Sequence, residues 1–270
     1  MSNTEPATEA PAAARFSAVQ DGKILRVTIT NPKRKNAIGY DTMVALGDTF
    51  LEAAQNPAVR AIVFSGEAGD FCTGADLSSS AAEAQRGITS ENVMDAANRL
   101  VRAIVDAPVP VIAKVTGAAA GVGVGIALAA DLVYAADDSY LLLAFINIGL
   151  MPDGGAAALV AAAAGRPLAA KMALLGERLP ATEARAAGLF TAVLPAAELD
   201  ATVDAVAEKI SSGPRRALEL TKRALNQSTL AALDETLATE KAGQVELLQS
   251  PDFFEGAGAM LTKRKPVFGD

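Results

Sequence analysis

Apolar and polar positions follow two different periods along the first part of the chain. In residues 23–30 every second side chain is apolar, the pattern of a strand buried on one face. In residues 41–55 the apolar side chains recur every three or four positions, with Asp41 as the expected N-cap and an Asn-Pro pair after the last turn. These segments predict a strand followed by an amphipathic helix.

Strands and helices continue to alternate as far as Gly155, and helical patterns dominate after it. Further strands are predicted at 59–64, 109–115, 131–136, 139–145 and 189–194, and further helices at 91–106 and 121–130. Strands alternating with helices indicate an α/β architecture. The change of pattern predicts a boundary near Pro195, with an α/β core at 16–195 and a helical region at 196–270.

The composition of the chain excludes several kinds of chemistry and says less about the fold. The 270 residues are 51% hydrophobic and 20% charged, and 24 basic against 31 acidic side chains give a net charge of −7, as in a soluble acidic protein. The absence of histidine excludes imidazole bases and ligands, so proton transfer falls to a carboxylate, lysine or tyrosine. Few aromatic residues and the acidic balance argue against nucleic-acid binding. The single cysteine, Cys72, matches no metal-binding spacing, and no metal is expected.

The chain carries no recognisable targeting or membrane segment. Glu5 and Glu9 stand where a signal peptide would be positively charged, and residues 1–15 are predicted to form a disordered tail. The apolar stretch at 115–130 is shorter than the roughly 18 residues of a membrane-spanning helix. We therefore expect a cytoplasmic protein without membrane association.

A glycine-rich run, GVGVG at 121–125, follows a predicted strand and opens a predicted helix. It is not a dinucleotide fingerprint, because the third glycine position of GxGxxG is occupied by Ile126. Gly117, Gly121 and Gly125 recur every four residues, and close helix packing by itself explains that spacing. The unpaired N–H groups of a first helical turn also bind anions, and we favour this role for the start of the helix.

A second small-residue turn, at 70–77, follows the predicted strand at 59–64. Taken alone it is typical of an ordinary surface loop. Taken together with the turn at Gly121, it allows two backbone N–H groups to point at one oxygen. The pair therefore indicates an oxyanion hole.

Four segments together resemble the crotonase (enoyl-CoA hydratase/isomerase) superfamily. They are NPKRKNAI at 31–38, SGEAGDFCTGADL at 65–77, KVTGAAAGVGVGIALAADLVYA at 114–135 and FINIGLMPDGG at 145–155. The resemblance extends from about Phe16 to the C-terminus. It implies a spiral of ββα units with a C-terminal helical subdomain, an acyl-CoA thioester as substrate with coenzyme A as part of it, and a homotrimer or a dimer of trimers.

The same resemblance assigns the thioester oxygen to backbone N–H groups. These belong to Ala75, after the glycine of CTGAD, and to Val122 or its neighbour Gly123. Members of the family usually have glycine in place of Val122, so a branched side chain here is expected to border the thioester. The two glutamates of the family's hydratases fall on Gly125 and Phe145, neither of which can exchange a proton.

Asp153, in the segment at 145–155, is the carboxylate that remains in the neighbourhood of the two missing glutamates. The other acids near the motifs are interpreted as loop or structural residues: Asp76, Asp131, Asp137 and Asp138. Local sequence alone favours a cap for the helix that starts near Gly155. The resemblance instead implies a catalytic base, because isomerases of one branch use an acid at the equivalent position. Burial beside Phe145, Leu150 and Met151 would raise the pKa of Asp153, whereas a helix N-terminus would lower it.

Two cationic runs, at 33–35 and 263–265, offer charge for the phosphates of coenzyme A, although each alone is typical of a solvated surface. The resemblance implies that Arg34 and Lys35 lie along these phosphates, that Lys263 reaches them from a neighbouring subunit, and that Met260 lies near the acyl or pantetheine channel. The residues expected to contact coenzyme A are Arg34, Lys35, Ala37, Gly74, Ala75, Asp76, Leu77, Met260 and Lys263.

The sequence therefore favours a Δ3,Δ2-enoyl-CoA isomerase with Asp153 as its single base. One alternative is a hydratase whose water is held by other groups. Another is a non-catalytic acyl-CoA binding protein, suggested by Val122, Gly125 and Phe145.

Overall fold

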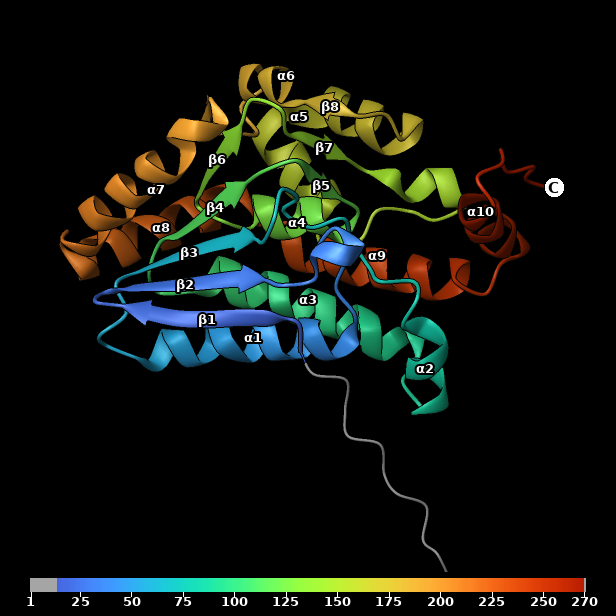
Figure 1. The fold of residues 1–270 in the computed structure, drawn as a ribbon, viewed down its shortest axis with the longest axis horizontal. Helices are drawn as coiled ribbons and strands as arrows, with labels where there is room; N and C mark the ends of the chain where they lie inside the picture. The colour runs from blue at the N-terminus through green and yellow to red at the C-terminus, as the bar shows by residue number, and fades with distance from the viewer. Residues whose placement is uncertain (1–13, 270) are drawn as a thin grey trace, which may run out of the picture.

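A computed structural model describes residues 14–269 as two sheets surrounded by helices (Figure 1). The larger sheet has the strand order β1-β2-β3-β4-β6-β9, in which β1 and β2 are antiparallel and all later pairs are parallel. Its strands are β1 (Phe16–Asp21), β2 (Ile24–Ile29), β3 (Ala61–Gly66), β4 (Val111–Val115), β6 (Leu132–Ala136) and β9 (Ala192–Leu194). The smaller sheet has the order β5-β7-β8. Its strands are β5 (Ala118–Ala120), β7 (Tyr140–Leu142) and β8 (Leu179–Pro180).

Helices cover both faces of the larger sheet. They are α1 (Tyr40–Gln55), α2 (Ser80–Gln85), α3 (Ser90–Asp106), α4 (Val122–Leu128), α5 (Ala156–Leu175), α6 (Ala181–Ala186), α7 (Ala196–Ser211), α8 (Arg215–Thr229), α9 (Leu233–Leu247) and α10 (Pro251–Leu261), with 3-10 turns η1 (Pro32–Arg34) and η2 (Ala144–Ile148). Helices α1 and α3 lie below the sheet in Figure 1, and α7 covers its other face. Alternate residues of β3 serve the two cores: Phe64 packs in the larger core and Val63 packs against α7.

The chain passes repeatedly from the larger sheet to the smaller sheet and then into a helix. It runs from β4 through β5 into α4, and from β6 through β7 into η2. Gly117, between β4 and β5, has φ +50°, and a Cβ atom there would overlap the carbonyl oxygen of Gly69. This repeated path is the spiral of ββα units expected from the sequence, and the predicted fold class is confirmed.

Most predicted elements are present, with differences at their ends. The helix predicted at 41–55 is α1, but its N-cap is Gly39 rather than Asp41, and its Tyr40 N–H donates to Glu83 Oε1 at 2.9 Å. Asp41 instead accepts two hydrogen bonds from Arg86, at 2.6 and 2.8 Å. The strand predicted at 139–145 ends at Leu142 and the chain turns into η2.

Three strands were not predicted from the sequence: β1, β5 and β8. Only residues 14 and 15 of the predicted disordered tail lie within the described residues. Arg15 belongs to the folded part, because its guanidinium donates to Asn31 Oδ1 at 2.6 Å and its N–H donates to Thr42 Oγ1 at 3.2 Å.

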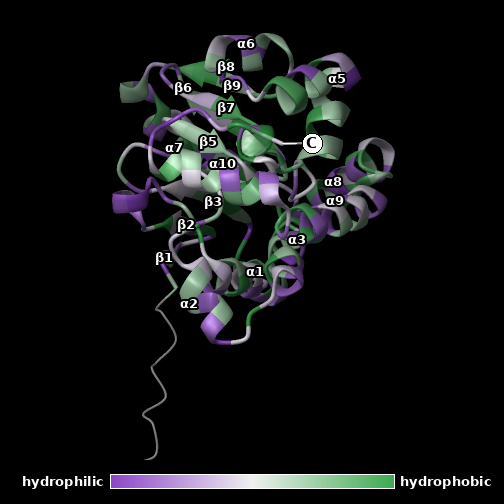
Figure 2. Ribbon diagram, turned by 90° about the vertical axis from the view of Figure 1, so that its right-hand side faces the viewer, coloured by the Kyte–Doolittle hydropathy of each residue, from purple (hydrophilic) through white to green (hydrophobic). Residues whose placement is uncertain are grey.

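The helices after Pro195 pack directly on the core. Helix α7 lies on the larger sheet, α9 contacts α3 and α5, and α10 contacts η2. At the last of these contacts a Cβ atom on Gly256 would overlap the backbone of Ile148, so the two elements touch through glycine. In Figure 2 the smaller sheet is largely hydrophobic, whereas hydrophilic residues gather on α2 and the outer turns of α8 and α9.

Within residues 14–269, α5 is the one helix long and apolar enough to cross a membrane by length and composition alone. Its first turn is buried at Ala156, and its backbone breaks at Gly165, where φ is +77°. It packs against α4, α9 and η2. These contacts make α5 part of the globular fold.

Candidate active site

The loop at 70–77 and the start of α4 lie against each other. Cys72 pairs with the β5 strand, donating its N–H to Ala118 O at 3.1 Å and accepting from Ala120 N–H at 2.8 Å. A Cβ atom on Gly123 would overlap the carbonyl oxygen of Cys72. Glycine at this position therefore allows the first turn of α4 to reach the loop.

Three backbone N–H groups at this junction have no acceptor among residues 14–269: those of Ala75, Val122 and Gly123. Around Ala75, Gly74 O accepts from Ile38 N–H and Asp76 N–H donates to Ile38 O, so the Ala75 N–H points away from Ile38. Val122 and Gly123 open α4, where N–H groups have no partner within the helix.

Gly74 and Gly121 bring the two sets of N–H groups together. Gly74 has φ +101°, a conformation that glycine adopts readily, and a Cβ atom on Gly121 would lie 3.5 Å from the Cα atom of Gly74. The same Cβ would lie 3.9 Å from Cζ of Phe145, which is buried. The junction therefore combines unpaired donors with an apolar wall, the arrangement of an oxyanion hole.

A buried polar network fixes the loop below this junction. The side chain of Asn36 donates to the carbonyl oxygens of Glu67 and Asp70 at 2.7 and 2.6 Å. Asp70 in turn accepts the N–H of Ala118 at 2.9 Å. Asn36 itself is fully buried, and its Oδ1 accepts the N–H of Asn31 at 2.9 Å. These bonds position the loop on β5.

The turn at 153–154 packs on the opposite side of α4. A Cβ atom on Gly154 would lie 2.7 Å from Cγ2 of Val122, and one on Gly125 would overlap the carbonyl oxygen of Gly154. Val122 is only 3% exposed, so its side chain faces this turn. Close contacts therefore run from the cluster of unpaired N–H groups through Val122 to the turn that carries Asp153.

The interpretation of Asp153 as a helix cap is wrong. The N-cap of α5 is Gly155, and no side chain of the turn caps the helix. The N–H groups of Gly155 and Ala157 donate instead to Glu240 of α9, at 2.7 and 3.0 Å. Asp153 is thereby left free of a capping role, and Glu240 fills that role from 85 positions away.

The carboxylate of Asp153 lies in a largely buried environment. Its Oδ2 accepts from Gln244 Nε2 at 2.8 Å, and its Oδ1 is buried without a partner among residues 14–269. The residue as a whole is half-buried, and Oδ1 is the carboxylate oxygen that solvent does not reach. Burial, reinforced by the negative charge of Glu240 and opposed by the Gln244 bond, raises the pKa of Asp153 to about 7. A base of that pKa suits proton exchange near neutral pH.

Glu240 and Gln244 were not singled out from the sequence. They continue the stripe formed by Leu233 and Leu237 on the buried face of α9, at helical spacing. Two polar residues on an otherwise apolar stripe are the signal that could have found them.

The expected contacts for coenzyme A fall in two places. Arg34 and Lys35 are exposed, and their carbonyl oxygens accept from Thr73 Oγ1 at 3.3 and 3.0 Å, which joins this cationic turn to the oxyanion loop. Ala37 lies beside the loop through Ile38, whose backbone bonds join Gly74 and Asp76. Asp76 accepts from Ser78, and Leu77 N–H donates to Ala75 O, so both belong to the same turn.

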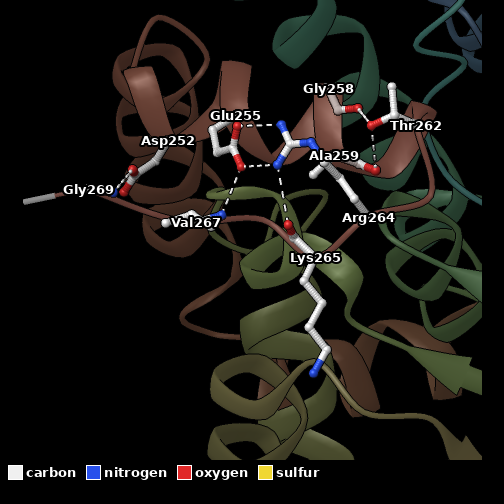
Figure 3. A network of polar contacts seen from close by, with 9 residues as sticks. All are labelled: Asp252, Glu255, Gly258, Ala259, Thr262, Arg264, Lys265, Val267 and Gly269. Atoms are coloured by element: carbon white, nitrogen blue, oxygen red, sulfur yellow. Dashed lines mark hydrogen bonds and ion pairs between the residues drawn. The ribbon is translucent and has the colours of Figure 1, made fainter.

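Met260 and Lys263 lie at the C-terminal end of α10, both exposed. Arg264, between the two lysines of the run, forms an ion pair with Glu255, whose carboxylate also accepts the N–H of Val267 at 2.8 Å (Figure 3). The Arg264 guanidinium lowers the pKa of Glu255 to about 2. These contacts anchor the final segment to α10.

Other polar features lie apart from this site. Hollows of about 580 and 280 Å³ lie between the larger sheet and α7, and neither is lined by Ala75, Val122 or Asp153. Lys222, which is buried, forms an ion pair with Asp131 at 2.8 Å. Burial raises the pKa of the Cys72 thiol to about 12, which makes it unreactive. Within residues 14–269 no group of three or more acidic or cysteine side chains could hold a metal ion.

Comparison with known proteins agrees with this geometry. The family model described as enoyl-CoA hydratase/isomerase matches residues 20–270. A probable enoyl-CoA hydratase of Rhodobacter capsulatus is 38% identical over 243 residues, covering 90% of this chain and 93% of that protein. The 1,2-epoxyphenylacetyl-CoA isomerase of Escherichia coli is 32% identical, with 94% and 97% covered.

Solved structures show the same fold. An enoyl-CoA hydratase from Mycobacterium avium subsp. paratuberculosis superimposes with a TM-score of 0.89 at 45% identity, covering 96% of this chain and all of that one. An enoyl-CoA hydratase/isomerase from Pseudoalteromonas atlantica gives 0.84 at 27% identity, with 94% and 100% covered. Sequence motifs, fold and relatives thus agree, and the chain belongs to the enoyl-CoA hydratase/isomerase family, the crotonase superfamily.

Proposed function

We propose that this acyl-CoA enzyme is a Δ3,Δ2-enoyl-CoA isomerase in which Asp153 is the only base. The observation that carries the proposal is the state of its carboxylate. It is buried, it caps no helix, its pKa is about 7, and it lies across Val122 from the unpaired N–H groups of the oxyanion hole.

The reaction needs one base and one anion site. Asp153 removes the C2 proton of a 3-enoyl-CoA, and the electrons move into the thioester carbonyl to give a dienolate. The N–H groups of Ala75 and of Val122 or Gly123 bind the dienolate oxygen. Asp153, now protonated, returns the proton to C4, which leaves a 2-enoyl-CoA and restores the carboxylate.

Two positions argue against addition of water as the main reaction. The hydratase glutamates of the family correspond to Gly125 and Phe145. Gly125 leaves no space for a side chain, because a Cβ atom would overlap the carbonyl oxygen of Gly154. Phe145 is buried beside Gly121 and presents only ring carbons to the oxyanion hole. Hydration remains the second candidate because several relatives are named as hydratases.

Coenzyme A would be held by charges outside the buried part of the site. We assign Arg34 and Lys35 to its phosphates, with Lys263 contributed by a neighbouring subunit and Met260 near the pantetheine channel. Phe254, Met260 and Leu261 are exposed apolar residues on α10, which supports assembly into a homotrimer or a dimer of trimers. We expect such an assembly to work in the cytoplasm.

Incubation of the purified protein with a 3-enoyl-CoA and, separately, with a 2-enoyl-CoA tests the proposal. Migration of the double bond without 3-hydroxyacyl-CoA supports the isomerase. Efficient formation of 3-hydroxyacyl-CoA from the 2-enoyl-CoA identifies a hydratase. Binding of both thioesters without turnover identifies a non-catalytic binding protein. Sedimentation of the full chain, compared with a chain ending at Ser250, tests the role of α10 in assembly.

A further inference from the structure

One face of α9 changes from apolar to polar as it passes the Asp153 turn. Leu233 and Leu237 pack on this face beside Gly155, and Glu240 and Gln244 continue it one and two turns later. Glu240 and Gln244 are each 1% exposed. Burying a carboxylate and an amide is costly unless their bonds serve the surrounding structure.

Glu240 binds the backbone of the turn. Both of its carboxylate oxygens accept N–H groups of the first turn of α5, from Gly155 and Ala157. These bonds stabilise its charge, while burial opposes it and raises its pKa. A carboxylate in this position also faces Asp153 with a like charge.

Gln244 binds the side chain of the same turn. Its Nε2 donates to Asp153 Oδ2 at 2.8 Å, while Gln244 Oε1 and Asp153 Oδ1 are both buried and find no partner in the part of the chain that the structure describes. Helix α9 reaches the turn through Gly243, where a Cβ atom would overlap the sulfur of Met151. Glycine beside Gln244 therefore allows the close approach that makes the bond.

We propose that Gln244 and Glu240 are positioning residues for Asp153 that act on its carboxylate in opposite directions, Gln244 favouring the ionised form and Glu240 the protonated form. The inference rests on the proposed role of Asp153 as the base. It extends that role by assigning control of the base to a helix that supplies none of the oxyanion-hole N–H groups.

An amide is suited to a base that takes up a proton and gives it back. When Asp153 is ionised, the Gln244 NH2 group donates to Oδ2. When the substrate proton is on Oδ1, the neutral Oδ2 still accepts from the same NH2 group, but this bond is weaker than the charge-assisted one, so the amide favours the ionised form. Asp153 Oδ1, which is without a partner within residues 14–269, is the oxygen left for the substrate proton.

Glu240 is the charged group that acts on Asp153 from the elements around it. Helix α4 is made of Val, Gly, Ile, Ala and Leu, η2 has the sequence AFINI, and the first turn of α5 carries no acidic or basic residue. Removal of Glu240 or of Gln244 should therefore shift the titration of Asp153 cleanly, and in opposite directions.

Titration of Asp153 in the intact protein tests the inference without substrate. Protein labelled with ¹³C at aspartate carboxyls is followed by NMR from pH 4 to 9, and the Asp153 signal is identified by its absence from Asp153→Asn. Gln244→Met should move the midpoint upward, because a bond to the ionised form is lost. Glu240→Gln should move it downward, because a like charge is lost.

Kinetics give a second readout. In Gln244→Met the acidic limb of kcat/KM for isomerisation should shift to higher pH, with a loss of about 3–10-fold at pH 6.5 and near recovery at pH 8.5. In Glu240→Gln the limb should shift to lower pH. Controls of the same chemistry on exposed positions are Gln249→Met and Glu246→Gln, which should leave both midpoints unchanged. If Gln244→Met does not fold, Gln244→Asn shortens the amide and removes the same bond.

The outcomes separate this inference from the proposed function. Unmoved midpoints in variants that fold would overturn the inference and leave Gln244 and Glu240 with a packing role alone. Opposite shifts in a protein without isomerase activity would support the positioning role of Gln244 and Glu240 and would contradict the proposed isomerase function. Opposite shifts together with displaced acidic limbs support both.

Discussion

The two halves of the candidate site are built in different ways. The oxyanion half consists of backbone N–H groups from Ala75, Val122 and Gly123, brought together by glycines close in sequence to them. The base half is a single carboxylate that depends on a distant helix, since Glu240 lies 85 positions after Gly155 and Gln244 lies 91 positions after Asp153. Backbone geometry makes the first half, and side chains from a distant helix make the second.

This difference indicates how substitutions can alter the oxyanion half and the base half separately. An oxyanion hole made of N–H groups tolerates changes of side chain as long as the turns keep their glycines. The proton affinity of a buried base depends on every charge and hydrogen bond around it. Substitutions on α9 can therefore tune the base without touching the oxyanion hole.

The largest effect is expected from removing the base itself. Asp153→Asn should lower the isomerase rate by about 10²–10⁴-fold, the usual contribution of a general base, with coenzyme A affinity nearly unchanged. Steady-state assays with a 3-enoyl-CoA and calorimetric titration with coenzyme A measure the two quantities. Full turnover in this variant would remove Asp153 from the mechanism.

A single methyl group added at Gly123 should disrupt the oxyanion half of the site. In Gly123→Ala the new Cβ overlaps the carbonyl oxygen of Cys72 and pushes α4 away from the loop. A backbone N–H group at the start of α4 then no longer points at the substrate oxygen. We expect the isomerase rate to fall by about 10–10³-fold and the free energy of unfolding by about 1–3 kcal/mol. The control is Gly269→Ala, outside α10, where no atom of the described residues lies within 4 Å of the new Cβ. Equal behaviour of the two variants would contradict the role of Gly123.

The burial of the base should be visible in stability. Because folding raises the pKa of Asp153 from 3.8 to about 7, the folded state binds the proton more tightly, and stability falls as pH rises through this interval. Asp153→Asn removes this cost and should be more stable than the natural protein by about 1–4 kcal/mol at pH 8, with little difference at pH 4. Denaturation at fixed protein concentration measures it, with exposed Asp138→Asn as the control. A constant difference between the two pH values would contradict a buried base.

The smallest effect is expected at Lys263, which lies outside both halves of the candidate site. Lys263 is exposed and acts through a screened charge, so Lys263→Ala should weaken coenzyme A binding by about 2–5-fold, more at low salt than at high salt. Lys209→Ala, exposed on α7, is the matched control. Equal affinities for both variants at low salt would remove Lys263 from the coenzyme A site.

The fold could be predicted because its signals are local, and the proposed oxyanion half rests on local signals of the same kind. Alternating apolar residues indicated β2, and the position of Val122 and Gly123 at a helix start indicated free N–H groups. The small-residue strand β5 carries only alanines, which gave no pattern of strand type. Helix α1 begins with a bond to Glu83 rather than a cap from Asp41, because a partner 43 positions away replaced the local one.

The base half could be predicted only in part. The position of Asp153 was expected, but the direction of its pKa shift was left open, because burial and a helix N-terminus act on it in opposite directions. Its partners were not expected, because Glu240 and Gln244 are joined to it only by the packing of α9. No local pattern connects residues so far apart.

The packing of α9 on the Asp153 turn also determines when, during synthesis, the protein can become active. The glycine turns of the oxyanion half are complete once residue 123 has been made, whereas 91 positions separate Asp153 from Gln244. Chains emerge from the ribosome N-terminus first, and contacts that close long loops form late. A growing chain therefore acquires the anion site long before its base is held and buried, so activity arrives as one of the last events of folding.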